Sequence, residues 1–133
     1  MIVVDANVLV YLIIQGEHTI QAEIAYNKDS NWIAPFLWRS EVCNVIAGYM
    51  RKKLVTLEEA INLFQKAEQI LKYNEYLIPS ENVLLLVERS KCSAYDCEYV
   101  ALAKQFDITL VTTDKLILSE FPEDAISLEK FVV

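Results

Sequence analysis

The chain has 133 residues, of which 54% are hydrophobic, 11% aromatic and 23% charged. This length fits a single domain, residues 1–133, and so large an apolar content excludes a disordered chain. The net charge of −7 argues against nucleic-acid binding unless a metal or a local cluster of basic residues offsets it, because phosphate binding requires positive charge.

Residue counts exclude several classes of site. Two glycines are too few for a phosphate-binding glycine loop or a dinucleotide fingerprint. One histidine and three cysteines without a CxxC pair give no zinc pattern. No apolar run reaches the length of a membrane span, and Asp5 interrupts the apolar N-terminus too early for a signal peptide. We therefore expect a cytoplasmic protein with no membrane partner.

Short apolar runs alternate with helical patterns along most of the chain. In chain order, the predicted elements are a strand at 1–5, helices at 6–14 and 17–28, a strand at 32–34, helices at 36–53 and 56–72, a strand at 75–78, helices at 80–91 and 94–106, a strand at 108–111, a short helix, and a last strand at 125–128. This alternation predicts an α/β fold with a mainly parallel sheet. The stretch 36–74 contains no strand and predicts a helical hairpin that stands off the sheet.

Local signals define some of these helices. Thr56 and Glu59 form a capping box at the start of the second hairpin helix. The dense basic cluster Arg51–Lys53 lies at the end of the first one, where it complements the helix dipole, and we interpret it as a solvated helix end. The helix at 17–28 is expected to turn Ile20 and Ile24 inward.

Two carboxylates follow predicted strands. Asp5 comes directly after the first strand, and Asp114 lies near the end of the strand at 108–111. Because the carboxyl ends of parallel strands share one edge of a sheet, both side chains are expected at the same edge. Each one alone is equally well explained as the N-cap of the helix that follows it.

Two further carboxylates lie on helix faces that are otherwise largely apolar. Glu41 has Leu37, Val45 and Gly48 at helical spacing, so it is expected to face inward or towards a cleft. Asp96 lies near the helix N-terminus that Ser93 caps, where the dipole alone favours an acid.

Four inward carboxylates would repel one another unless a cation joined them. A set of oxygen donors without histidine or cysteine favours Mg²⁺ or Mn²⁺ over zinc. Such an ion holds a phosphodiester, activates water and reverses the acidic field locally.

Four segments resemble the acidic motifs of PIN domains, in the order and at the separations usual in that family. They are VVDANVLVY at 3–11, SEVCNVI at 40–46, YDCEYVALA at 95–103 and LVTTD at 110–114. The resemblance covers essentially the whole chain, and its single-domain size is most similar to the VapC toxins of toxin–antitoxin pairs. Residues 56–91 match no motif and are expected to shape the choice of substrate and partner.

This resemblance implies a three-layer α/β/α fold and a Mg²⁺- or Mn²⁺-dependent endoribonuclease. Asp5, Glu41, Asp96 and Asp114 match the acidic quartet, with Asp5, Asp96 and Asp114 expected to hold one or two ions and Glu41 to bind a second ion or orient a water. Asn7 and Thr112 match polar positions that border the site. The resemblance also implies an RNA substrate, a homodimer and a cognate antitoxin that blocks the cleft.

Arg39, two residues before Glu41, and Lys115, next to Asp114, are the first candidates for phosphate contacts. A catalytically silent PIN scaffold that binds RNA or a protein partner is the main alternative. A phospho-receiver domain would need adjacent acids after its first strand, and an Asp-nucleophile phosphatase would need a second acid at position 7, where this chain has asparagine. Both fit less well.

Overall fold

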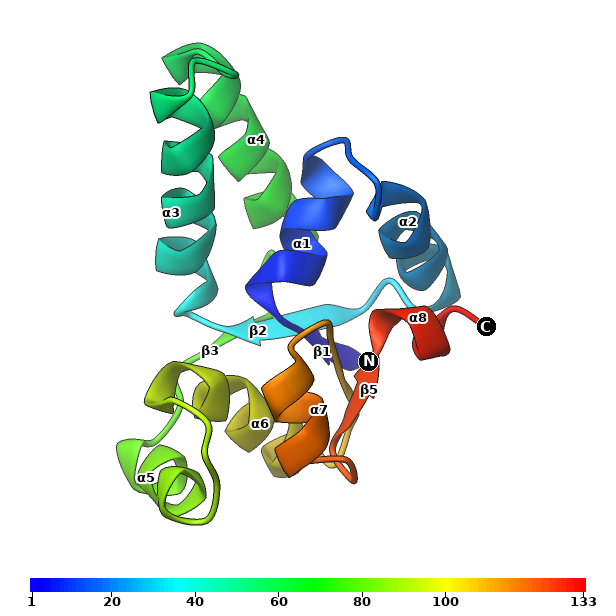
Figure 1. Cartoon of the computed structure of the whole chain (residues 1–133), viewed down its shortest axis with the longest axis vertical. Helices are drawn as coiled ribbons and strands as arrows, with labels where there is room; N and C mark the ends of the chain where they lie inside the picture. The colour runs from blue at the N-terminus through cyan, green and yellow to red at the C-terminus, as the bar shows by residue number, and fades with distance from the viewer.

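The computed structural model describes all residues from Met1 to Val133, and its centre is a five-stranded sheet (Figure 1). The strands are β1 (Ile2–Val4), β2 (Trp32–Pro35), β3 (Glu75–Tyr76), β4 (Leu110–Thr112) and β5 (Ala125–Ser127). Their order is β3-β2-β1-β4-β5, and every neighbouring pair is parallel. The predicted α/β fold with a mainly parallel sheet is thus confirmed.

Helices cover both faces of the sheet and form three layers. They are α1 (Ala6–Ile13), α2 (Thr19–Lys28), α3 (Trp38–Arg51), α4 (Leu57–Ile70), α5 (Ser80–Glu88), α6 (Ala94–Phe106), α7 (Lys115–Glu120) and α8 (Leu128–Phe131). In Figure 1, α1 to α4 and α8 lie above the sheet, while α5, α6 and α7 lie below it. None of these helices combines the length and the apolar content that a membrane span requires.

The order of the strands determines where side chains from distant segments meet. The central strand β1 pairs with β2 on one side and with β4 on the other. The chain therefore leaves β1 towards one edge and crosses to the other edge after β3, which makes the carboxyl ends of β1 and β4 a topological switch point. Asp5 follows β1 directly, and Asp114 follows β4 after one intervening residue.

The helical hairpin of α3 and α4 stands off the sheet as predicted, and its base is packed tightly (Figure 1). The fully buried indole of Trp38 stacks on the ring of Phe64 with centroids 5.2 Å apart. The same indole donates a 2.8 Å hydrogen bond to Glu75 of β3, which ties the hairpin to the edge strand. The predicted capping box of Thr56 and Glu59 is present at the start of α4.

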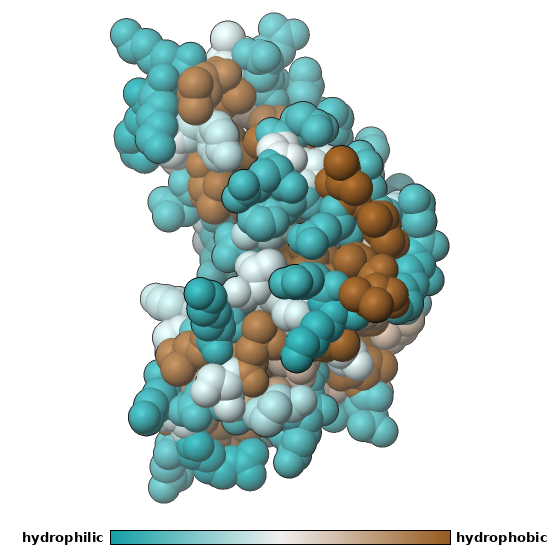
Figure 2. Space-filling model, turned by 45° about the vertical axis from the view of Figure 1, so that its right-hand side comes forward, coloured by the Kyte–Doolittle hydropathy of each residue, from teal (hydrophilic) through white to brown (hydrophobic).

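Part of the hairpin surface remains uncovered. Leu57 on α4 is 65% exposed, and Figure 2 shows apolar side chains among hydrophilic ones on the upper part of the molecule, which the hairpin occupies.

The prediction that Ile20 and Ile24 of α2 point inward was wrong. Ile20 is 68% and Ile24 43% exposed, whereas Ala22 and Ala25 are buried. Small residues let α2 approach its neighbours closely, and the larger side chains then point outward.

Candidate functional site

The carboxylates of Asp5 and Asp114 each cap the helix that follows their strand. One oxygen of Asp5 accepts a 3.0 Å hydrogen bond from the amide of Val8, and one oxygen of Asp114 accepts a 2.9 Å bond from the amide of Ile117. The capping interpretation is therefore correct for both residues. A cap engages one oxygen of each carboxylate, and it fixes the orientation of the group at the edge of the sheet.

Thr112, the last residue of β4, connects the two aspartates. Its side chain is fully buried, and its hydroxyl donates a hydrogen bond to the second oxygen of Asp5. The same hydroxyl oxygen accepts a 3.0 Å bond from the amide of Asp114. One hydroxyl therefore orients the side chain of Asp5 and the backbone that carries Asp114.

Glu41 lies in the first turn of α3 and is oriented by a tyrosine from another layer. The hydroxyl of Tyr99 in α6 donates a 2.5 Å hydrogen bond to Glu41. Tyr99 is only 2% exposed. Tyr99 was not among the residues that the sequence predicted for the site. The signal was available, because a buried tyrosine hydroxyl usually finds a hydrogen-bond partner.

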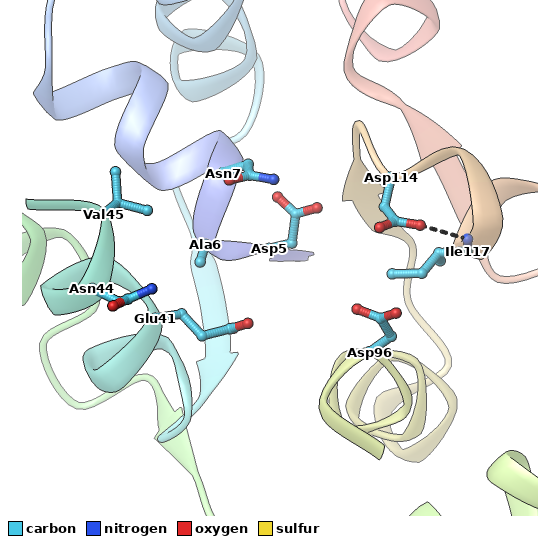
Figure 3. A pocket seen from close by; sticks show the side chains of 9 residues that line it. All are labelled: Asp5, Ala6, Asn7, Glu41, Asn44, Val45, Asp96, Asp114 and Ile117. Atoms are coloured by element: carbon cyan, nitrogen blue, oxygen red, sulfur yellow. Dashed lines mark hydrogen bonds between the residues drawn. The ribbon is translucent and has the colours of Figure 1, made fainter. Parts of the chain in front are cut away.

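Asp96 enters the same region from the N-terminus of α6. The side chain of Ser93 caps this helix by accepting a 3.1 Å bond from the amide of Asp96, as predicted. The cap places Asp96 in the first helical turn, with its carboxylate directed away from the helix towards Asp114 and the centre of the pocket (Figure 3).

These side chains line one pocket of about 220 Å³. Its lining residues are Asp5, Ala6, Asn7, Glu41, Asn44, Val45, Asp96, Asp114 and Ile117. Figure 3 shows the carboxylates of Asp5, Glu41 and Asp96 directed into the shared space from three different elements. Asn44, one turn after Glu41, is a second polar lining residue that the sequence analysis did not select; its spacing from Glu41 was the signal for it.

The pocket is electrostatically uncompensated. Burial raises the pKa of Asp5 to about 6. Burial, followed by the charge of Asp114, raises the pKa of Asp96. Burial and the charge of Asp96 raise the pKa of Glu41, although the hydrogen bond from Tyr99 opposes this shift. None of the ion pairs in the structure involves any of the four acids. The protein itself therefore supplies no cation to this pocket.

The two basic residues expected to contact phosphate, Arg39 and Lys115, do not line the pocket. The guanidinium of Arg39 binds Glu75 with two bonds of 2.6 and 2.8 Å, and it binds Glu68 with a third of 2.9 Å. It joins α3, α4 and β3 and does not line the pocket, which argues against the expected phosphate contact. Lys115 is exposed at the start of α7 and is not among the lining residues either.

The donor set suits a hard divalent cation. The pocket offers carboxylate and amide oxygens and neither histidine nor cysteine, a combination that favours Mg²⁺ or Mn²⁺. No three acidic, cysteine or histidine side chains converge closely enough to hold an ion by themselves. Mg²⁺ is usually bound through one or two carboxylates together with waters and substrate phosphate, so this arrangement fits it.

Comparison with known proteins gives a consistent family. A family model described as PIN domain matches residues 2–122. The chain is 28% identical over 124 residues to a curated protein, Ribonuclease VapC3 of Pyrobaculum aerophilum, and this match covers 91% of the chain and 95% of the relative.

Two solved structures share the fold. The crystal structure of PAE2754 from Pyrobaculum aerophilum superposes with a TM-score of 0.77 at 23% identity, covering 98% of this chain and 85% of that one. A toxin–antitoxin complex from Klebsiella pneumoniae superposes with a TM-score of 0.70 at 16% identity, covering 96% and 98%. At these identities the two likenesses establish the fold alone.

Proposed function

This chain belongs to the PIN-domain family, and on that premise we propose that it is a metal-dependent endoribonuclease that acts as the toxin of a toxin–antitoxin pair. The observation that carries the proposal is the pocket lined by four acidic side chains from four separate segments of the chain, with no basic residue in its lining. The similarity to a protein named as a ribonuclease, over 91% of this chain, supports the choice of RNA as substrate.

Asp5, Asp96 and Asp114 are the residues that would hold one or two Mg²⁺ or Mn²⁺ ions, and Glu41 would bind a second ion or orient the attacking water. Once bound, such an ion would supply positive charge against the phosphodiester and would activate water, so that hydrolysis would require no covalent nucleophile from the protein. The proposed site thus uses the repulsion among the acids to favour cation binding.

The remaining polar residues position these groups and the substrate. Thr112 holds Asp5 and the backbone of Asp114 in place through its hydroxyl. Tyr99 holds Glu41. The amides of Asn7 and Asn44 line the pocket and offer neutral donors to phosphate or ribose oxygens without adding charge.

Removing the metal or one carboxylate tests the proposal. With single-stranded and structured RNA and added Mn²⁺ or Mg²⁺, the native chain should cleave, and EDTA should abolish cleavage. Asp96→Asn and Glu41→Gln should each lower the rate by about a hundredfold or more, since each removes a preorganised charged group. Asp107→Asn and Glu23→Gln are matched controls on the exposed surface and should cleave normally.

Cleavage that persists in EDTA or in both variants would rule out the metal–carboxylate mechanism. Binding of Mn²⁺ and RNA without cleavage of any substrate would instead favour a catalytically silent PIN scaffold. The scaffold alternative draws on the observation that no three acidic, cysteine or histidine side chains converge closely enough to hold an ion by themselves.

Tyr99→Phe should lower kcat by about ten- to a hundredfold and leave KM nearly unchanged, because loss of a partner that orients an active-site group typically has this effect. The variant keeps the aromatic ring in the core and removes only the hydroxyl that bonds to Glu41. Steady-state cleavage kinetics and a thermal melt together check the prediction. An unchanged kcat would show that Glu41 does not depend on Tyr99 for its orientation.

We propose two protein partners, an antitoxin and a second copy of the chain. The proposed place of action is the cytoplasm. A solved neighbour described as a toxin–antitoxin complex supports the first. An apolar groove of about 340 Å³ between α3 and α4, with Ile46, Met50, Ile61 and Phe64 in its lining, offers a surface for a protein segment. We expect a short antitoxin to be encoded beside this chain, and co-expression of the two should yield a complex without ribonuclease activity. Light scattering should give the mass of a dimer for the free toxin.

A further inference from the structure

The acidic net charge leaves open how this protein would hold a nucleic acid beyond the scissile phosphate. Several basic side chains are already engaged: Arg39 with two glutamates, Lys104 with Asp124 at 2.9 Å, and Lys28 with the carbonyl of Phe131 at 2.6 Å. The basic cluster Arg51–Lys53, at the end of α3, is exposed and forms no ion pair.

One face of α3 connects this cluster to the acidic pocket. Glu41, Asn44 and Val45 line the acidic pocket. A second groove of about 340 Å³ is lined by Val45, Gly48, Tyr49, Lys52 and Leu54. Val45 belongs to both, so the two hollows adjoin. The residues repeat at three- and four-residue intervals and share one helix face, which extends roughly 16 Å from Glu41 to Lys52 at the usual helical rise.

Gly48 in the middle of this face has no packing reason to be glycine. A Cβ built there would meet nothing within 4 Å. Glycine in a helix interior is unfavourable relative to alanine, so a glycine that packs against nothing calls for another explanation. Because Gly48 has no side chain, the second groove stays open down to the helix backbone between Val45 and Lys52.

The lining of the groove combines an aromatic ring with a basic side chain, the two kinds of group that bind single-stranded nucleic acids. The aromatic ring of Tyr49 is half-buried in the groove wall, the ammonium of Lys52 is exposed at its far end, and Leu54 is 62% exposed beside it. Stacking of bases on aromatic rings, combined with basic side chains along the backbone, is the general mode of single-strand binding.

We infer that the groove over Gly48, Tyr49 and Lys52, which we call the α3 groove, binds the single-stranded RNA segment next to the scissile phosphate. This inference rests on the proposed ribonuclease function and adds the path of the substrate to it. A base stacks on Tyr49, Lys52 contacts the backbone, and Gly48 lets the strand lie close to the helix. A few nucleotides span the distance from the acidic pocket to the tip of the hairpin.

The apolar groove between α3 and α4 lies on the opposite face of the same helix, since its α3 residues are Cys43, Ile46, Ala47 and Met50. An RNA strand in the α3 groove and a protein segment in the apolar groove therefore use different surfaces of α3. This separation allows the two occupants to be distinguished by substitutions on a single helix.

The test uses Gly48→Gln, Tyr49→Leu and Lys52→Ala in the full chain, with Lys130→Ala on the exposed surface of α8 as the matched control. Gly48→Gln should raise Tm, because glutamine is the better helix former, and yet raise KM for a twelve-nucleotide RNA about tenfold. Tyr49→Leu should raise KM by a similar factor. Lys52→Ala should reduce the slope of log KM against log salt by about one. For a dinucleotide substrate, which offers the groove at most one nucleotide, the three substitutions should change KM much less than they do for the twelve-nucleotide RNA.

Fluorescence anisotropy with a labelled twelve-nucleotide single-stranded RNA, in EDTA, separates this inference from the proposed function. If no RNA is cleaved but the three substitutions weaken binding, the proposed function fails and the α3 groove stands as an RNA site. If RNA is cleaved and neither KM nor the anisotropy Kd changes in the variants, the inference is overturned. A changed oligomeric mass in Gly48→Gln with an unchanged KM also overturns it, because the groove is then an interface between copies.

Discussion

Asp5→Asn is expected to stabilise the metal-free protein above pH 6 while it lowers the rate of RNA cleavage by about a thousandfold. The loss of activity follows from removing a charged group at the centre of the proposed site, where single preorganised groups account for factors of about 10² to 10³. The gain in stability follows from burial, which holds the pKa of Asp5 at about 6, well above the ordinary value of 3.8.

The sign of the pH dependence follows from this shift. Below about pH 4 the carboxyl is protonated in both the folded and the unfolded chain, and its ionisation has no effect on stability. Stability is lost as pH rises from about 4, where the unfolded chain ionises, to about 6, where the folded chain ionises, and above pH 6 the folded state holds a buried charge that the unfolded state exposes to water. A shift of about two units corresponds to roughly 3 kcal/mol, at 1.36 kcal/mol per unit. Asparagine removes this penalty and still caps α1, because it is as good an N-cap as aspartate.

Urea denaturation in EDTA at pH 4 and pH 8 checks the prediction. The difference in unfolding free energy between Asp5→Asn and the native chain should be fully present at pH 8 and small at pH 4. Added Mn²⁺ should raise Tm for the native chain and leave the variant unchanged. Asp107→Asn, an exposed aspartate, is the control for a general effect of lost negative charge. A variant that is less stable at pH 8 would contradict the argument.

Thr112→Val is expected to lower the cleavage rate by about ten- to a hundredfold and to destabilise the fold by about 1–3 kcal/mol. Valine matches the shape of threonine but removes the hydroxyl that donates to Asp5 and accepts from the amide of Asp114. The amide of Asp114 then lacks a partner, and the pKa of Asp5 rises further because the hydrogen bond that opposes its shift is lost. A higher Mn²⁺ concentration should be needed for half-maximal activity.

Thr112→Ser is the matched control, since it keeps the hydroxyl and loses only a methyl group from the core. Cleavage assays over a range of Mn²⁺ concentrations, together with thermal melts of all three proteins, separate the two effects. The Thr112→Ser variant should need the same Mn²⁺ concentration for half-maximal activity as the native chain, even if its melting temperature is lower. Equal losses of activity in the serine and valine variants would show that Thr112 acts through packing alone.

The acidic pocket shows how one side chain serves both folding and the proposed chemistry. Asp5 and Asp114 each cap a helix with one oxygen, which fixes the carboxylate at the edge of the sheet. The cap and the proposed ligand role were alternatives in the sequence analysis, but they are compatible because each carboxylate oxygen that accepts a hydrogen bond keeps a second lone pair. Folding thus orients the groups that the proposed metal would use.

Local sequence determined the elements and the residues that bring the acids to the pocket. Apolar β-branched runs predicted the strands, capping residues such as Ser93 and Thr56 predicted the helix starts, and the order of elements predicted a parallel sheet. Asp5 and Asp114 could be placed at one edge because parallel strands align their carboxyl ends. Strands and helix starts depend on residues that are close together in the sequence. The shared sheet edge depends on the alternation of strands and helices, which is also visible in the sequence.

The tertiary structure alone decided which partners the polar side chains find. Arg39 pairs with Glu75, 36 residues away, and does not line the pocket that contains Glu41. Tyr99 reaches Glu41 across 58 residues, and Thr112 reaches Asp5 across 107. Ile20 and Ile24 point outward because alanines on α2 occupy the tight contact. Hydrogen bonds over such separations depend on how the layers pack, and no local pattern of residues encodes that packing.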